Sequence, residues 1–416
     1  MSTDPGASSR IFFSKTKGRG WLSGFLLLGS LIGSTVSLPL AWDYHFEAQS
    51  HDVGLYFLGL NAGAVAGTAL AHAFRRTASP RVLAPTGCVA AVLGWLVLAA
   101  AAPPAPALYR VLGLGFLGSA AGVVGASVFA ALDEIYHGAI RAVAGSAGVL
   151  FGCGAFLSTA VIALTYAAGS EKTASLILAT FSLAYAIVFG FRPAPRDMRS
   201  PEIREQDRRF AASPRRSRTL GTFLFAMLIF LQSGMEWGVA VWLPFFFVRR
   251  FGINPLWAIW TTAIYFLLLT FARVSGRGMI ARTGHRKWLF TSASASVVGC
   301  IILAEASSPI PAWSAVCLVA LGFAPIYPLL ADTANELFGY TPAFYNGMFA
   351  VGITGAMTTS CVLGFVELAV GMRFVMLVPA AGSMAVLCVA LLSQLEARLM
   401  ADSKPSPPRV FRAGQQ

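Results

Sequence analysis

The stretch that decides the fold runs from Leu220 to Val248 and reads LGTFLFAMLIFLQSGMEWGVAVWLPFFFV. It contains no Lys or Arg, and it is longer than the ~20 apolar residues that a helix needs to cross a bilayer. Glu236 nevertheless stands near its middle, with Gln232 one helical turn earlier on the same face. A carboxylate at that depth costs roughly 2.5–3.5 kcal/mol on membrane-insertion scales, so it usually faces water or a partner. The stretch therefore predicts a transmembrane helix beside a polar pathway.

The composition of the whole chain is that of a membrane protein. Of its 416 residues, 56% are hydrophobic and only 12% are charged, which is too apolar for a soluble domain of this size. The formal net charge of +13 comes from short basic blocks between apolar runs. Such blocks set membrane topology and do not form a nucleic-acid-binding surface. We therefore expect the lipid bilayer as a partner and no nucleic acid.

Apolar runs of transmembrane length recur along the chain. They predict an all-α membrane protein with twelve transmembrane helices. The predicted helices cover Trp21–Trp42, Val53–Phe74, Val82–Ala102, Ala107–Leu132, Ala142–Ala168, Ala174–Phe191, Leu220–Val248, Leu256–Val274, Trp288–Ala304, Ala312–Leu330, Ala343–Leu368 and Phe374–Leu395.

Lys and Arg are distributed unevenly between alternate loops. With the N-terminus in the cytoplasm, the outer loops hold only Lys172, Arg249, Arg250 and Arg373, whereas Arg273 and most other basic residues fall on the cytoplasmic side. This bias obeys the positive-inside rule. We therefore expect a multi-pass protein of the cell inner membrane with both termini in the cytoplasm.

The longest polar segment, residues 192–219, is rich in Pro and Arg and leaves six apolar runs on either side. It cannot bury an apolar face, so we expect a cytoplasmic linker. The linker joins an N-terminal six-helix bundle over residues 21–191 to a C-terminal six-helix bundle over residues 220–395. Residues 1–20 and 396–416 are predicted cytoplasmic tails.

A basic cluster follows the second apolar run of each half. In the first half it is Gly67-TALAHAF-Arg75-Arg76, and in the second half it is Gly276-RGMIARTGHR-Lys287. A repeat of six spans and six spans around a long central loop is typical of one large class of transporters.

On these residues the chain resembles the major facilitator superfamily. The second cluster is similar to a loop motif of that superfamily, with Ala281 where the motif has an acidic residue. Arg110, followed by Gly113 and Gly115, resembles the superfamily's signature in the fourth span. The resemblance implies two six-helix bundles that rock about a substrate site near the middle of the membrane.

Within this superfamily the second half is most similar to the fucose:proton symporter group. The similarity lies in Ala272–Arg282, Leu321–Pro328 and Gly352–Phe365, and in the Gly-x-Glu-Trp sequence of the seventh span. It implies proton symport. The fucose symporter has acidic residues in its first and fourth spans, and Thr35 and Gly118 stand at those positions here. The resemblance therefore does not extend to those carboxylates.

Glu236 is the candidate for proton coupling. A low-dielectric site favours the neutral form of a carboxyl group, so Glu236 could take up a proton on one side of the membrane and release it on the other. The alternative is a structural carboxylate bonded to a neighbouring helix. Because ionisable residues inside membranes usually serve transport, we expect Glu236 to line a polar cavity open to one face.

Five further residues are candidates for substrate binding. Arg110 could pair with a carboxylate or an anionic substrate, or it could snorkel from the end of its helix. Thr35 could bind substrate or simply hold helices together. Gln232 shares the face of Glu236, and Trp237 could stack on a ring-bearing ligand. Tyr327 lies between two prolines that break a helix within the membrane, where freed carbonyls could face a cavity; the alternative is a simple kink.

These features predict a transporter of a small polar organic solute. Import by proton symport is the first hypothesis, because of the subgroup resemblance. The alternative is export of a small metabolite or drug by proton antiport. A sensor or membrane enzyme would need a large extramembrane domain or a catalytic cluster, and the sequence shows neither. We expect a monomer with protons and a small molecule as partners.

We expect no enzymatic activity, no cofactor and no metal. The sequence contains no Walker loop, nucleophile elbow or HExxH motif. The loop from Asp43 to Asp52 is rich in metal-capable side chains, but their spacing matches no standard metal site.

Overall fold

The computed structural model describes residues 18–46, 50–74, 77–101, 105–136, 141–168, 170–192, 219–283, 285–330 and 342–402. Within these ranges it contains twelve helices that are long and apolar enough to cross a membrane. This confirms the predicted all-α, twelve-span fold class. The helices are α2 (Gly24–Phe46), α3 (Ser50–Phe74), α4 (Pro80–Ala100), α5 (Ala107–Tyr136), α6 (Arg141–Ala167), α7 (Glu171–Phe191), α9 (Thr219–Phe251), α10 (Pro255–Thr283), α11 (His285–Glu305), α12 (Pro309–Phe323), α14 (Pro342–Val370) and α15 (Met372–Asp402).

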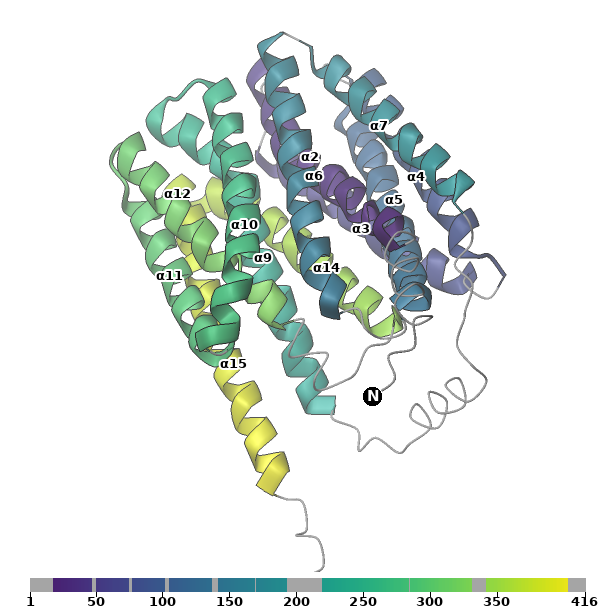
Figure 1. Cartoon of the computed structure of the whole chain (residues 1–416). Coiled ribbons are helices and arrows are strands. Elements are labelled where there is room, and N and C mark those ends of the chain that lie inside the picture. Colours follow the sequence, from purple (N-terminus) through teal and green to yellow (C-terminus); the bar gives the residue numbers. More distant parts are fainter. Residues whose placement is uncertain are drawn as a thin grey trace, which may run out of the picture.

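The helices form two bundles that repeat one packing pattern (Figure 1). In the first bundle α2 packs on α6, α3 on α5 and α4 on α7, and in the second bundle α9 packs on α14, α10 on α12 and α11 on α15. These pairs correspond in a repeat of six helices. Because the number of spans is even, α2 begins and α15 ends at the same face of the molecule. We call it the terminal face, and the other the opposite face.

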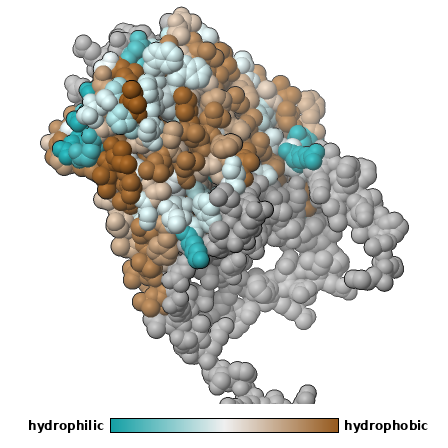
Figure 2. Space-filling model, turned by 60° about the vertical axis from the view of Figure 1, so that its left-hand side comes forward, coloured by the Kyte–Doolittle hydropathy of each residue, from teal (hydrophilic) through white to brown (hydrophobic). Residues whose placement is uncertain are grey.

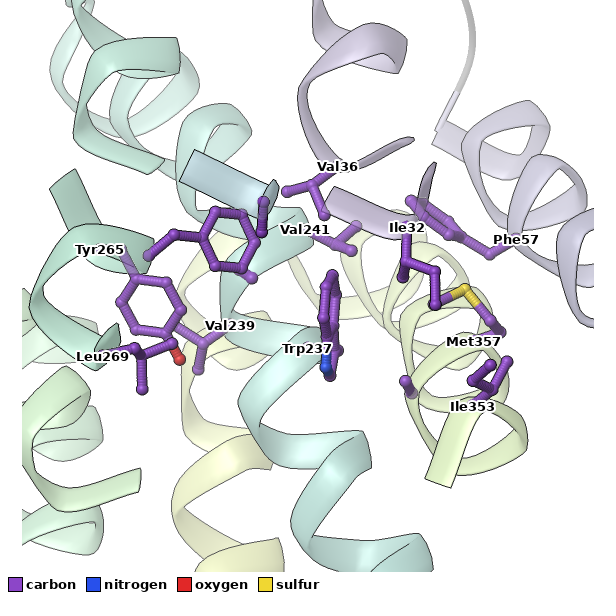
Figure 3. Close-up of a cluster of buried hydrophobic side chains, with 14 of the residues drawn as sticks. Ile32, Val36, Phe57, Trp237, Val239, Val241, Tyr265, Leu269, Ile353 and Met357 are labelled. Atoms are coloured by element: carbon purple, nitrogen blue, oxygen red, sulfur yellow. The ribbon is translucent and has the colours of Figure 1, made fainter. Parts of the chain in front are cut away.

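The bundles meet mainly along two pairs of helices, α3 with α14 and α6 with α10. Between the bundles lies a group of buried apolar side chains, which we call the interface cluster. Since α9 runs from the terminal face to the opposite face, the two α9 members of the cluster lie between Glu236 and the opposite face along that helix. The interface cluster consists of Ile32 and Val36 of α2, Phe57 of α3, Trp237 and Val241 of α9, and Ile353 and Met357 of α14 (Figure 3).

Close packing of α3 against α5 depends on glycines. A Cβ atom on Gly63 would overlap the backbone of Gly115, and one on Gly118 would overlap the carbonyl oxygen of Leu60. The two backbones can approach this closely only where side chains are absent, as is common between membrane helices. The glycines therefore make the first bundle compact.

The outer surface of the bundles is apolar. Leu70, Leu112, Leu164 and Phe271 are each exposed over half of their surface or more. Figure 2 shows hydrophobic residues over much of the face in view, with hydrophilic residues confined to a few places. An apolar surface of this extent is unfavourable in water and suits contact with lipid. The chain is a multi-pass membrane protein.

The helix ends differ most from the predicted ones at α10, α12 and α15, and α15 continues to Asp402, past the predicted end at Leu395. α10 continues to Thr283, past the predicted end at Val274, because a helix that leaves the membrane need not end where its apolar run ends. α12 ends at Phe323 and the chain is helical again over residues 326–330, so the span Pro309–Leu330 agrees with the predicted run Ala312–Leu330 but contains a break. The cause is the pair Pro325 and Pro328, whose nitrogens carry no hydrogen for a helical hydrogen bond.

Several predicted segments lie outside the described residues. They include most of the predicted linker and of the two tails, together with Arg75 and Arg76 of the first basic cluster. The predicted domain boundaries and the cytoplasmic position of these segments therefore stay predictions.

Candidate functional site

Glu236 forms a buried ion pair with Arg273. The carboxylate lies near the middle of α9, and the residue is 7% exposed. Its Oε1 atom accepts a hydrogen bond from Nη2 of Arg273 on α10 at 2.6 Å, and the two side chains are 9% and 10% exposed. Each charge offsets the cost of removing the other from water. An ion pair to a neighbouring helix also fits the structural alternative, so the proton-coupling role of Glu236 stays a prediction.

The break in α12 holds Arg273 from the other side. Pro328 has no N–H to donate to the carbonyl four residues earlier, which belongs to Ala324. Arg273 uses that carbonyl instead, and its Nε donates to the Ala324 oxygen at 3.3 Å. The carbonyl freed by the break therefore binds a side chain of the site. The guanidinium is fixed between α9 and the end of α12.

Tyr265 lies next to Glu236, and Trp237 follows Glu236 on α9. Tyr265 of α10 donates its hydroxyl hydrogen to the backbone oxygen of Glu236 at 3.1 Å. Trp237 packs edge-on against Phe151 of α6, with ring centroids 6.0 Å apart, and at 5.5 Å from Phe266 of α10. Figure 3 places Trp237 and Tyr265 among the buried residues where the bundles meet. Trp237 thus connects the helix of Glu236 to the first bundle.

The ion pair retains unused hydrogen-bonding capacity. Arg273 donates through Nε and Nη2, whereas its Nη1 makes no hydrogen bond with the described residues. Glu236 accepts through Oε1, and its Oε2 atom likewise has no hydrogen bond with them. A guanidinium group has five N–H donors in a planar fork. Another acceptor can therefore join the pair without displacing the contact to Ala324.

Gln232 and Thr35 are both buried but are not hydrogen-bonded to Glu236. Gln232 is 0% exposed, and neither atom of its amide has a hydrogen-bond partner among the described residues. The hydroxyl of Thr35 donates to the carbonyl of Ile32 in its own helix at 2.6 Å. Their predicted roles in substrate binding stay predictions.

Arg110 lies apart from this site, one turn inside the opposite-face end of α5. Its Nε donates to the Tyr56 hydroxyl at 2.7 Å, and its Nη1 donates to the carbonyl of Ala105 at 2.8 Å. The guanidinium also lies 5.7 Å from the centre of the Trp42 ring. The side chain points into its own bundle and does not snorkel towards lipid.

Tyr327, the remaining candidate, follows the break in α12. It is partly buried and packs against the hydrophobic core. The break belongs to the site through the carbonyl of Ala324, which accepts a hydrogen bond from Arg273. The predicted substrate contact of Tyr327 stays a prediction.

Arg273 is the residue that sequence reasoning missed. By loop position it falls among the basic residues that set topology, yet it also lies inside the predicted span Leu256–Val274. An arginine within a span is as costly as a carboxylate and needs a partner. That signal could have paired Arg273 with Glu236 before the structure was known.

Metal ligands and pockets do not identify another centre. Among the described residues no group of three His, Cys, Asp or Glu side chains could hold a metal ion, and the side chains of residues 43–51 lie outside that set. The expected polar cavity around Glu236 stays a prediction. A small pocket lies near the terminal face, and its lining residues are Ala71, His72, Ala78, Pro80, Leu83, Ala126, Ser127, Ala130 and Asn346.

Solved structures share the fold of this chain. The E. coli fucose:proton symporter FucP matches with a TM-score of 0.62 and 16% identity, over 90% of this chain and 98% of that one. A D-xylose-proton symporter matches with a TM-score of 0.71 and 14% identity, over 91% and 97%. The human organic anion transporter MFSD10 matches with a TM-score of 0.68 and 14% identity, over 90% and 99%. At such identities the similarity concerns the fold alone.

No curated protein sequence matches the chain. The sequence pattern of the Major Facilitator Superfamily, however, matches residues 20–357. That match covers the first bundle and most of the second, and it agrees with the structural similarities. The chain is therefore a member of the Major Facilitator Superfamily, a family of transporters.

Proposed function

We propose that the protein is a secondary active transporter that moves a small polar organic solute by alternating access, coupled to protons through Glu236. The observation that carries the proposal is the buried ion pair between Glu236 and Arg273. The pair links the titratable side chain of Glu236 to α10, the helix that packs against α6 of the first bundle. Such a link is what coupling between protons and movement of the bundles requires.

The proposed coupling runs through α10. A proton on Glu236 removes the negative charge, and the attraction that holds Arg273 then weakens. α10 packs against α6 of the first bundle, where a Cβ atom on Gly152 would overlap the Thr270 side chain. A shift of α10 therefore changes how the bundles pack. In this way protonation of Glu236 favours a different arrangement of the two bundles.

Symport is the first hypothesis for direction, and antiport the second. Two of the similar structures are described as proton symporters of sugars, which supports import together with protons. Export of a metabolite or drug by proton antiport remains the alternative, because the same ion pair can serve either direction. The balance of Lys and Arg supports an inner-membrane location with the terminal face in the cytoplasm. We expect the protein to act as a monomer.

The test is solute uptake into proteoliposomes with an imposed pH gradient. Labelled L-fucose, D-xylose, lactate and benzoate are offered to the purified full-length protein. We expect an inward proton gradient to drive uptake of at least one solute, and Glu236→Gln to abolish the effect of the gradient. Glu367→Gln is the matched control, because it breaks a second Arg–Glu pair, with Arg249 at 2.9 Å, away from the proposed site.

Three outcomes contradict either the proposed coupling through Glu236 or the symport hypothesis. Gradient-driven uptake that persists unchanged in Glu236→Gln rules out coupling through this residue. If the gradient drives uptake of none of the four solutes, their transport is not coupled to protons, and this outcome contradicts the symport hypothesis. Accumulation of a solute inside the vesicles that is driven by an outward proton gradient selects antiport.

A further inference from the structure

We infer that the transported solute is a small organic anion with one negative charge, and that Arg273 binds its anionic group when Glu236 is protonated. The inference rests on the proposed function, in which Glu236 carries the proton. It adds the chemical class of the solute and a substrate-binding role for Arg273.

The geometry of Arg273 offers an edge for a carboxylate. Nη1 makes no hydrogen bond with the described residues, and Nη2 is held only by Glu236. These two nitrogens form one of the two sides of the guanidinium that can receive a carboxylate in a bidentate pair. Nε remains on the carbonyl of Ala324 and keeps the group in place. An incoming carboxylate can therefore replace Glu236 without moving the arginine.

The charge balance favours an anion over a neutral solute. When Glu236 takes a proton from water, its negative charge disappears, while the arginine stays protonated. A buried charge without a partner is strongly unfavourable. A solute with one negative charge restores neutrality, a neutral solute leaves Arg273 unpaired, and a cation adds repulsion. The proton and the anion therefore bind together, and the loaded site is as neutral as the empty one.

Neighbouring side chains do not supply the missing negative charge. Tyr265 and Cys300 of α11 are titratable groups near the pair, and a phenol and a thiol are uncharged near pH 7. α12 contains no charged residue, and α6 contains none beyond Arg141. In the part of the chain that the structure describes, the other buried charge is Arg110, which is also a cation. Glu236 is the one acidic residue on the described helices α6, α9, α10 and α12, so when it is protonated the charge of Arg273 is left for a solute to balance.

The position of Arg273 suits a solute that must contact both bundles. A Cβ atom on Gly148 of α6 would have Cδ of Arg273 as its nearest neighbour, at 4.0 Å. At this position the first bundle presents a glycine, which has no side chain, next to Arg273. Trp237, between Phe151 and Phe266, provides an apolar surface for the organic part of the solute.

The experiment measures thermal stabilisation of the purified full-length protein by added ligands at about pH 5.5 and pH 8. The probes are benzoate and lactate, each compared with its neutral amide, benzamide or lactamide. We expect at least one carboxylate to stabilise the protein, more tightly at the lower pH, and the amides to have no effect. Glu236→Gln cannot become charged, so it should bind the same carboxylate equally at both pH values.

Substitution of Arg273 tests the assigned residue. We expect Arg273→Gln to weaken carboxylate binding by roughly thirtyfold or more, because a buried charged hydrogen-bond partner is lost. If that variant fails to fold, Arg273→Lys is used instead, because it keeps the positive charge but loses the planar fork of N–H donors. It should bind the carboxylate more weakly, with the same pH dependence. Glu367→Gln should bind as the unmodified protein does.

The inference is overturned if neither carboxylate stabilises the protein or Glu236→Gln, if the amides bind as well as the carboxylates, or if both Arg273 variants bind normally. A neutral solute taken up with protons through Glu236 overturns the inference and leaves the proposed function intact. Carboxylate binding to Arg273 without proton-driven uptake overturns the proposed coupling and leaves the anion site intact.

Discussion

At the scale of single residues, Glu236 and Arg273 each need a partner of opposite charge, because each is a charge that has been removed from water. Their side chains are 9% and 10% exposed, and Nη2 lies 2.6 Å from Oε1. Removing one partner from such a pair leaves the other charge buried alone, which is worse than removing both. The pair can therefore be tested by single and double substitution.

We expect Arg273→Gln to lower the free energy of unfolding by about 3–5 kcal/mol, since it strands the carboxylate of Glu236. The double variant Glu236→Gln/Arg273→Gln should recover most of this loss, because no buried charge remains. Thermal unfolding of the purified proteins in one detergent measures the difference. A double variant as unstable as the single one would show that the two side chains do not stabilise each other.

The acidic member of the pair is predictable from sequence, and the basic member is harder to assign. Glu236 stands in the middle of a long apolar run, where position alone makes it exceptional. Arg273 stands near the end of its run, close to the basic cluster, where topology offers an ordinary reason for an arginine. Only the packing of α9 against α10 shows that its side chain turns inward to a carboxylate.

At the scale of secondary-structure elements, the break in α12 is the part of the site with the clearest sequence cause. Two prolines three residues apart predict that the helix is interrupted, and α12 ends at Phe323 as they require. The prolines do not say what replaces the lost hydrogen bonds. The answer comes from another helix, because Arg273 reaches the carbonyl of Ala324.

We expect Pro328→Ala to reduce proton-driven solute uptake while leaving the protein folded. The new N–H of residue 328 can donate to the Ala324 carbonyl, and it competes with Nε of Arg273. A hydrogen bond to a charged group contributes about 1.5–3 kcal/mol, which corresponds to about tenfold or more in rate or affinity. Uptake into proteoliposomes with a fixed pH gradient measures the effect.

The matched control is Pro309→Ala, because Pro309 is the first residue of α12. A proline there has no helical hydrogen bond to break, so its replacement should leave uptake unchanged. Equal losses in the two variants would show that proline content, and not the Ala324 carbonyl, determines the outcome.

At the scale of the whole molecule, the number of helices and their assembly into two bundles follow from sequence, because apolar runs and a long polar segment are robust signals. The contacts between bundles do not follow. α3 meets α14 and α6 meets α10, and these pairs come from opposite halves of the chain. The α6 side of the second contact includes Gly148 and Gly152, and glycines such as Gly63 also lie where helices of one bundle pack together, so no pattern in the sequence distinguishes the contacts between bundles.

We expect Gly54→Cys to form a disulfide with Cys361 and to stop transport. A Cβ atom on Gly54 of α3 would lie 3.4 Å from Sγ of Cys361 on α14, and Cys361 is a free thiol. This separation is compatible with a disulfide after small adjustments. The bond would tie the two bundles together near the opposite face, which must open in alternating access.

Uptake measured before oxidation, after oxidation and after reduction provides the readout. Oxidation should reduce uptake to the level of empty liposomes, and a reducing agent should restore it. Gly54→Ser has a side chain of similar size and should not respond to oxidation. Normal uptake by a fully cross-linked protein would mean that the bundles do not separate at this face.

The length of α10 has a consequence for how the buried site communicates with its surroundings. The membrane-spanning part covers Pro255–Gly276, whereas the helix continues to Thr283. At 1.5 Å per residue, the extra residues carry it about 10 Å beyond that part. Since the helix is continuous, Arg273 and the protruding end move together as one rigid body. A tilt of α10 that separates Arg273 from Glu236 therefore also moves the end of the helix at the bilayer surface. Lipid head groups there can oppose or favour that movement.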